Sequence, residues 1–181
     1  QIYSELKSAD QNLSVIDFSK VLSQHSDEYI YYRTDHHWTT LGAYYAYVEY
    51  CAQKGLTPVS MEDLPQPNTV EDFYGTYYSK AKRPGQQADT ITWYDVDVDE
   101  FAFVANLNQD PQLKELGTVV QEDGLELLSV DGMMDERKLS TRDKYAAFTW
   151  GNSGYSVIKS SHNLDHKEGK TSRLLIFKDS Y

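Results

Sequence analysis

The chain has 181 residues, which fits one domain with a sizeable apolar core, and no apolar run approaches the ~18 residues of a membrane span. Hydrophobic residues make up 40% and charged residues 25%, as in ordinary globular proteins, and the net charge of −11 argues against nucleic acid as a partner. The only cysteine, Cys51, excludes an internal disulfide and a zinc site with two thiolates.

The first third of the chain predicts two strands and two helices. Residues 13–17 ("LSVID") alternate as a strand does, "FSKVLSQH" predicts a short helix, and "EYIYY" (28–32) is rich in strand-forming residues. Thr39 or Thr40 can cap a helix that runs to about Lys54, and Gly55 is a natural C-terminal stop.

The rest of the chain favours strands. We expect a loop over 56–89, a strand within 89–104, a short helix within 106–116 and a hairpin over 117–130 that turns at Asp123-Gly124. A short helix over 140–150, capped by Ser140, and strands at 155–161 and 173–177 follow. This order predicts a single α/β domain over 1–181 with a β-rich insertion near residues 90–130.

Both ends of the sequence fall inside predicted elements. The opening "QIYSELKSAD" starts within a probable helix pattern, and "SRLLIFKDSY" stops directly after a buried-strand pattern. We therefore expect a fragment of a longer chain, in which any targeting segment lies elsewhere.

The stretch "YYRTDHHWTT" (31–40) brings an aspartate, two histidines and a tryptophan together before the predicted helix. If the stretch is extended, Asp35 and His37 share one side and His36 faces the other. That geometry favours a carboxylate that orients an imidazole as general base, and it disfavours a metal site built from both histidines. The alternative is an ordinary loop, in which Asp35 caps a turn and the histidines pack against tyrosines.

Two further candidates lie near the C-terminus. Ser180 follows the strand pattern "LLIF" at its carboxyl end, where α/β sheets commonly place reactive groups, although such a serine often only caps a helix. Gly151 and Asn152 can donate N–H groups to an oxyanion, or can simply form a turn.

Together these stretches resemble the DHHW protein family, named for the tetrapeptide at 35–38. The resemblance continues in "DFYGTYYSK" (72–80), "GN" (151–152) and "LLIFKDSY" (174–181), in preserved order. The family is similar to the SGNH hydrolases and to the alginate O-acetylation proteins of cell-surface polysaccharide systems.

The resemblance implies a fold, an activity and a location. The fold is an SGNH-hydrolase-like three-layer α/β/α domain, incomplete at both ends in this chain. The activity is serine-dependent O-acyl transfer, or esterase action, on acetyl groups of a cell-surface polysaccharide. The location is extracytoplasmic, and a membrane-bound acyl donor protein is an implied partner.

The resemblance also assigns roles to residues. Ser180 is the expected nucleophile, His37 the base and Asp35 its orienting carboxylate, with no metal or other cofactor. Asn152 and Gly151 are candidate oxyanion or substrate contacts, and Trp38 can stack on a sugar ring.

One residue departs from the SGNH pattern, and two other functions stay open. Lys178 stands where the usual serine block has a glycine. The first alternative is a catalytically inactive relative that binds polysaccharide or a protein partner. The second is a metal-dependent phosphoesterase, suggested by Asp-His-His and by "SHNLDH" (161–166), although the two motifs occur here in the reverse order.

Overall fold

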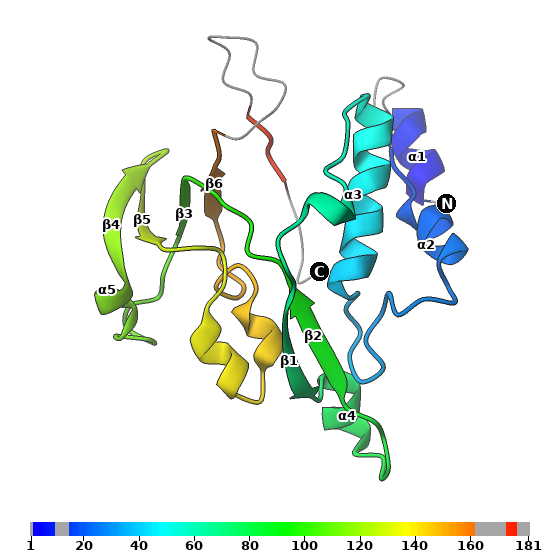
Figure 1. Ribbon diagram of the computed structural model, residues 1–181. Helices are drawn as coiled ribbons and strands as arrows, with labels where there is room; N and C mark the ends of the chain where they lie inside the picture. The colour runs from blue at the N-terminus through cyan, green and yellow to red at the C-terminus, as the bar shows by residue number, and fades with distance from the viewer. Residues whose placement is uncertain (1, 10–14, 162–172, 177–181) are drawn as a thin grey trace. The chain divides into compact units, whose positions relative to one another are not determined.

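The computed structural model describes residues 2–9, 15–161 and 173–176, and it shows a mixed α/β fold (Figure 1). The chain divides into two compact units, residues 1–93 and 94–181, and each is described by itself. The expectation of one domain over the whole chain stays a prediction. Within the described segments, no helix combines the length and the apolar character needed to cross a membrane.

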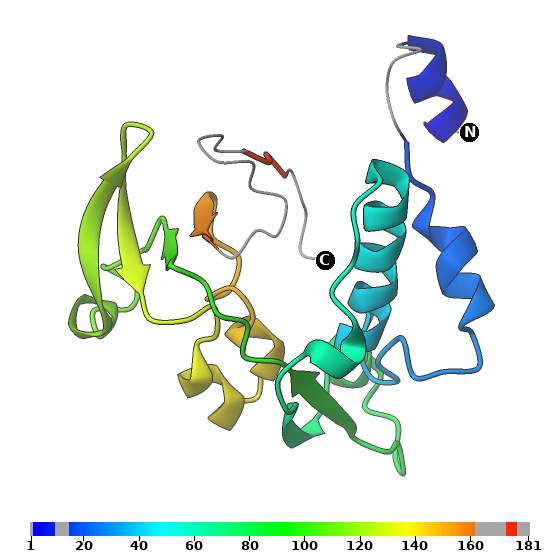
Figure 2. The same cartoon turned by 45° about the horizontal axis from the view of Figure 1, so that its top comes forward.

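The first unit contains the helices α1 (Ile2–Ala9), α2 (Phe18–Gln24) and α3 (Thr40–Lys54), and α2 packs beside α3 (Figure 2). The Thr39 hydroxyl caps α3 by accepting the Gly42 amide at 3.3 Å. Gly55 ends the helix in the left-handed conformation, with φ of 67°. The predicted second helix and its two caps are therefore confirmed.

A two-stranded antiparallel ribbon completes the first unit. Strand β1 (Asn68–Phe73) pairs with β2 (Asp89–Trp93), and the 3₁₀ turn η1 (Met61–Asp63) precedes β1. The helix α4 (Thr76–Ala81) lies in the connection between the strands. The predicted loop over 56–89 is wrong for β1 and α4, because the polar β1 sequence gains its strand conformation from pairing with β2.

The predicted strand at 28–32 is also wrong. The Tyr32 amide donates to the His37 carbonyl at 3.2 Å, and the Thr39 amide donates to the Ile30 carbonyl at 2.8 Å. These bonds close residues 31–38 into a loop, whose only ladder contact is the single bridge between Tyr31 and Trp38. Local pairing within the loop takes the place of a sheet partner.

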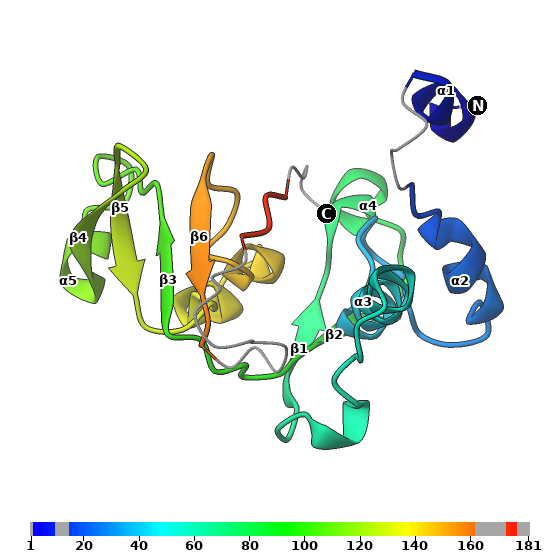
Figure 3. The same cartoon turned by 90° about the horizontal axis from the view of Figure 1, so that it is seen from above.

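The second unit is built on an antiparallel sheet with the strand order β4-β5-β3-β6 (Figure 3). The strands are β3 (Glu100–Phe103), β4 (Gly117–Glu122), β5 (Leu125–Val130) and β6 (Ser156–Lys159), and α5 (Leu113–Leu116) precedes β4. Asp123 and Gly124 join β4 to β5 with φ of 49° and 78°, the left-handed pair of a tight hairpin turn. The predicted hairpin is confirmed.

The core of this unit contains Phe101, Phe103, Leu113, Leu128 and Val130. The β-rich insertion near residues 90–130 stays a prediction; β2 belongs to the ribbon of the first unit, and β3 to β5 lie in one sheet with β6. All paired strands in the described residues are antiparallel. The three-layer fold therefore stays a prediction.

The predicted helix over 140–150 is wrong. Two 3₁₀ turns form instead, η2 (Glu136–Ser140) and η3 (Lys144–Ala147). Thr149 and Trp150 have φ of 50° and 55°, so a right-handed helix cannot extend to residue 150. In addition, the described residues 173–176 of the last predicted strand are not in a strand.

Gly42 predicts a measurable packing constraint. A Cβ atom at this position would lie 2.5 Å from the Ile30 carbonyl oxygen, which is backbone and cannot rotate away. Gly42→Ala should lower the free energy of unfolding by about 1–2 kcal/mol, because the overlap outweighs the gain in helix propensity. Urea denaturation measures the change. Gly154→Ala is the control, since its added methyl meets nothing within 4 Å, and equal stability of both variants would contradict the close approach.

Candidate functional site

The candidate site lies on the loop between residue 31 and α3. Asp35 is 5% exposed and His37 is 7% exposed, so both ionisable side chains are buried. Two backbone hydrogen bonds close the base of the loop, and the Thr39 hydroxyl donates to the Tyr29 carbonyl at 2.8 Å. The loop therefore has a fixed backbone path, although it forms neither helix nor strand.

Asp35 and His37 form a direct carboxylate–imidazole pair. Asp35 Oδ1 is hydrogen-bonded to His37 Nδ1 and also accepts the His37 amide at 3.1 Å. Because an ionised carboxylate only accepts, His37 Nδ1 carries the proton of this hydrogen bond. In the neutral ring, Nε2 is then the nitrogen that can take a proton, as a general base requires. The sequence prediction that these two side chains meet is confirmed.

The second carboxylate oxygen of Asp35 is held by the start of α4. Asp35 Oδ2 accepts the Thr76 amide and the Thr76 hydroxyl, each at 2.6 Å. Gly75 makes this approach possible, because a Cβ atom there would overlap the Asp35 carboxylate. Both residues lie within "DFYGTYYSK", but nothing in the sequence pattern predicts a role for either of them.

His36 does not face away from His37. The two rings lie with their centroids 3.9 Å apart at an interplanar angle of 36°, and His36 Nδ1 lies 2.9 Å from the Thr76 hydroxyl. The expectation that His36 points to the opposite side is therefore wrong, because the loop is closed rather than extended. Since the Thr76 proton goes to Asp35, the Thr76 oxygen accepts from His36 Nδ1–H.

The carboxyl group of Asp35 stays ionised far into the acid range. Burial raises its pKa, but hydrogen bonds from the Thr76 hydroxyl, from the Thr76 amide and from His37 more than offset this and lower the pKa to about 2. The carboxylate can therefore hold the His37 tautomer and stabilise the positive imidazolium that forms when Nε2 accepts a proton.

The same residues are a possible ligand set for a metal ion. Asp35, His36 and His37 each offer one ligand atom, and these atoms lie within 4.8 Å of one another. However, Asp35 Oδ1 and His37 Nδ1 already bond each other, and Thr76 occupies Asp35 Oδ2. A metal bound through Asp35 Oδ1 or His37 Nδ1 would have to replace their charge-assisted hydrogen bond.

The other predicted site residues lie next to this pair in the sequence, in the second unit, or outside the described residues. Trp38 is half-buried in the first unit, while Asn152 is exposed and Gly151 adopts a left-handed φ of 84° in the second unit. Ser180 lies outside the described residues. The roles of these residues stay predictions.

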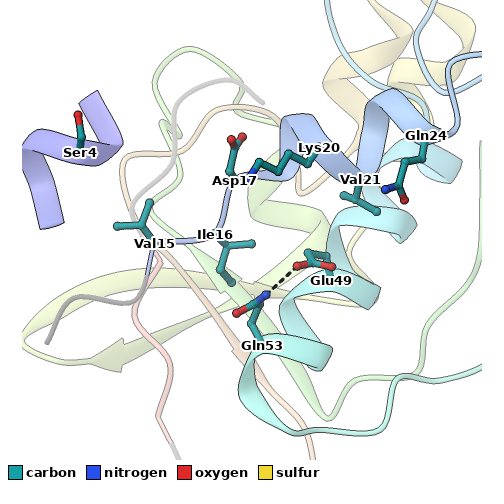
Figure 4. A pocket seen from close by; sticks show the side chains of 9 residues that line it. All are labelled: Ser4, Val15, Ile16, Asp17, Lys20, Val21, Gln24, Glu49 and Gln53. Carbon is teal, nitrogen blue, oxygen red and sulfur yellow. Dashed lines mark hydrogen bonds between the residues drawn. The ribbon is translucent and has the colours of Figure 1, made fainter. Parts of the chain in front are cut away.

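A hollow of about 620 Å³ lies elsewhere in the first unit (Figure 4). Asp17, Lys20, Glu49 and Gln53 contribute to its lining, and Gln53 donates to Glu49 at 2.9 Å. The lining includes neither histidine of the candidate site, so the hollow is a separate surface feature.

Comparisons with known proteins agree on one family. A family model described as DHHW protein matches residues 2–181. The crystal structure of a DHHW family protein from Eubacterium siraeum is similar, with 27% identity and a TM-score of 0.56. The match covers 86% of this chain and 48% of the other, so this chain spans about half the length of that protein. No curated protein matches.

The lowered pKa of Asp35 predicts how stability depends on pH. Because the folded carboxyl titrates near 2 and the unfolded one near its ordinary value of 3.8, the unfolded chain binds the proton first as the pH falls. The stability that Asp35 contributes is thus complete above about pH 5 and is lost between about 4 and 2. Urea denaturation should show that wild type and Asp35→Asn differ in their free energy of unfolding, and that this difference becomes smaller as the pH falls from about 4 to about 2. A difference independent of pH would contradict the assignment.

Gly75 is predicted to be required for the carboxylate contact. Gly75→Ala should destabilise the fold by about 1–3 kcal/mol, because the methyl displaces Asp35 from Thr76. The variant should also lose the acid-dependent part of the stability, which a packing defect far from Asp35 would leave intact. Denaturation at pH 7 and pH 3 measures both effects, with Gly154→Ala as the control.

Proposed function

Because the chain belongs to the DHHW protein family, we propose that it supplies the general base of a serine-dependent O-acyltransferase or esterase. The observation that carries the proposal is the buried Asp35–His37 pair, in which a carboxylate fixes the imidazole tautomer. The Thr76 amide and hydroxyl both donate to Asp35 Oδ2, so the carboxylate is held in one orientation with Oδ1 toward the His37 ring.

The proposed reaction has two acyl-transfer steps. Ser180 Oγ attacks the acyl carbonyl carbon while His37 Nε2 takes the hydroxyl proton, and Asp35 stabilises the imidazolium. The tetrahedral intermediate collapses to acyl-serine as the leaving alcohol takes the proton from His37. A sugar hydroxyl or water then attacks the acyl-serine, with His37 again as base, and Ser180 is released. Gly151 and Asn152 are the candidate donors to the oxyanion.

The substrate and setting follow from the family resemblance. We propose acetyl groups on a cell-surface polysaccharide as the substrate, with Trp38 as a sugar contact and a membrane-bound protein as acyl donor. The protein would act outside the cytoplasm. We also propose the three-layer SGNH-type fold. The protein in the similar crystal structure is longer than this chain, which matches 48% of it.

Metal-dependent phosphoester hydrolysis is the second candidate function. The grouping of Asp35, His36 and His37 within 4.8 Å favours it. The hydrogen bonds that already connect Asp35, His37 and Thr76 favour the acid–base role instead. Metal analysis of the purified full-length protein separates the two, since a stoichiometric transition metal lost in both His36→Ala and His37→Ala would support the phosphoesterase.

The acyl-transfer proposal predicts labelling of one serine. The folded full-length protein should react with a fluorophosphonate probe at Ser180, because a serine activated by a histidine is the nucleophile that such probes trap. His37→Ala should slow labelling by about 10²-fold or more, in line with the loss of a general base. Mass spectrometry of labelled peptides locates the site and gives the rate.

The controls separate a base from a structural histidine. His25 also contacts a carboxylate, with Nδ1 2.6 Å from Glu28 Oε1, but it lies at the end of α2 rather than on the 31–38 loop. His25→Ala should label at the wild-type rate and Ser180→Ala should not label. Absence of label in the folded wild-type protein would favour a catalytically inactive polysaccharide- or partner-binding relative.

A further inference from the structure

We propose that Asp89 is a positioning residue that fixes the loop carrying Asp35 and His37, acting through Thr34 and the start of α4. The proposal deepens the function proposed above and rests on it, since positioning matters to a rate only if His37 takes part in the reaction. The sequence offered no sign of this role, because Asp89 lies at the end of a stretch that predicts a loop.

Asp89 is 1% exposed. Within the described chain, the donors to its carboxylate all come from the segment that precedes Asp35. Its Oδ1 accepts the Tyr29 hydroxyl and, at 2.9 Å, the Arg33 amide. Its Oδ2 accepts the Thr34 amide at 2.7 Å and the Thr34 hydroxyl at 2.5 Å. Four donors from residues 29–34 thus converge on one buried carboxylate.

The convergence explains why an aspartate is needed. Two oxygens with about four lone-pair sites match four donors, whereas an asparagine would turn an NH₂ group toward two of them. The Arg33 guanidinium lies 3.7 Å from Oδ1 and adds a positive charge beside the buried carboxylate. This set of hydrogen bonds offsets the desolvation penalty of a buried carboxylate, whereas half of the set would leave part of that penalty uncompensated.

Thr34 connects Asp89 to the start of α4 through hydrogen bonds. Its hydroxyl oxygen, which donates to Asp89, accepts the Gly75 amide at 3.0 Å. Its carbonyl accepts the amides of Tyr77 and Tyr78 at 2.9 and 3.2 Å. Thr34 is fully buried, so these bonds do not compete with water.

The start of α4 then holds Asp35 itself. Gly75 allows the approach, and Thr76 gives its amide and hydroxyl to Asp35. The ribbon also joins Asp89 to the segment that leads into α4, because Phe73 of β1 is paired in register with Asp89 of β2. The loop is therefore held at two places, by Asp89 of the ribbon at Arg33 and Thr34 and by Thr76 of α4 at Asp35.

Histidine side-chain NMR of the full-length protein tests the proposal. In wild type, the ¹⁵N signals at pH 8 should show His37 protonated at Nδ1. In Asp89→Asn, His37 should become a mixture of tautomers, the Arg33 and Thr34 amides should exchange at least about tenfold faster, and any Ser180 labelling should slow by about tenfold or more. A folded Asp89→Asn with unchanged His37 tautomer overturns the proposal.

A second pair of variants applies if Asp89→Asn does not fold. Thr34→Val keeps the shape of the side chain but loses the hydroxyl that joins Asp89 to Gly75, whereas Thr34→Ser keeps the hydroxyl. We expect the tautomer mixture in Thr34→Val and recovery of most of the wild-type signal in Thr34→Ser. An unchanged His37 signal in Thr34→Val also overturns the proposal.

Tyr45→Phe is the matched control. Tyr45, like Tyr29, gives its hydroxyl to a carboxylate, in this case Glu28 at 2.7 Å, and the other hydrogen-bond partner of that carboxylate is His25 rather than a residue of the 31–38 loop. The His37 ¹⁵N signals of Tyr45→Phe should match those of the wild type. Because the main readout is a tautomer, failure of the wild type to label at Ser180 would count against the proposed function alone.

Discussion

A carboxylate can be buried only where donors surround it, and the first unit is organised around two such groups. Asp35 and Asp89 are both nearly inaccessible to water, and each accepts hydrogen bonds from a segment distant in the chain, which Asp35 combines with those from its neighbour His37. Residues 29–37 and the start of α4 supply these donors, and one end of the β1–β2 ribbon supplies the Asp89 carboxylate. If either carboxylate lost its partners, the cost of an uncompensated buried charge would fall on all three segments.

This arrangement explains how a small scaffold can hold an imidazole in place. The ribbon has two strands, which alone would be marginally stable in water. Charge-assisted hydrogen bonds, which are stronger than neutral ones, connect the ribbon to the loop and the loop to α4. The histidine pair thus receives its orientation from long-range contacts, while the sequence adjacent to it mainly provides the closed loop.

The parts that could be predicted from the sequence are those fixed by local rules. The helix α3 follows from the hydroxyl at Thr39 and the glycine at residue 55, and the hairpin follows from Asp123-Gly124 between two apolar strands. The Asp35–His37 contact also follows from spacing, since the two residues are only two positions apart. Local signals of this kind depend on the backbone within a few residues.

The parts that could not be predicted depend on distant partners. Strand β1 and helix α4 have weak local signals, and both form because they contact β2 and the carboxylate of Asp35. The orientation of His36 was mistaken because its position in a closed loop, beside Thr76, cannot be inferred from residue alternation. The role of Asp89 requires knowing that a residue 55 positions after Thr34 accepts its amide.

That same sequence separation sets an order of assembly during synthesis. Residues 35–37 leave the ribosome well before Asp89 and Thr76, and they acquire their fixed geometry only when the later segment folds back onto them. A nascent chain that ends before residue 89 would lack the anchor that Asp89 gives to Arg33 and Thr34. The fixed geometry of Asp35 and His37 is therefore completed late in folding, after the segments that hold it have been synthesised.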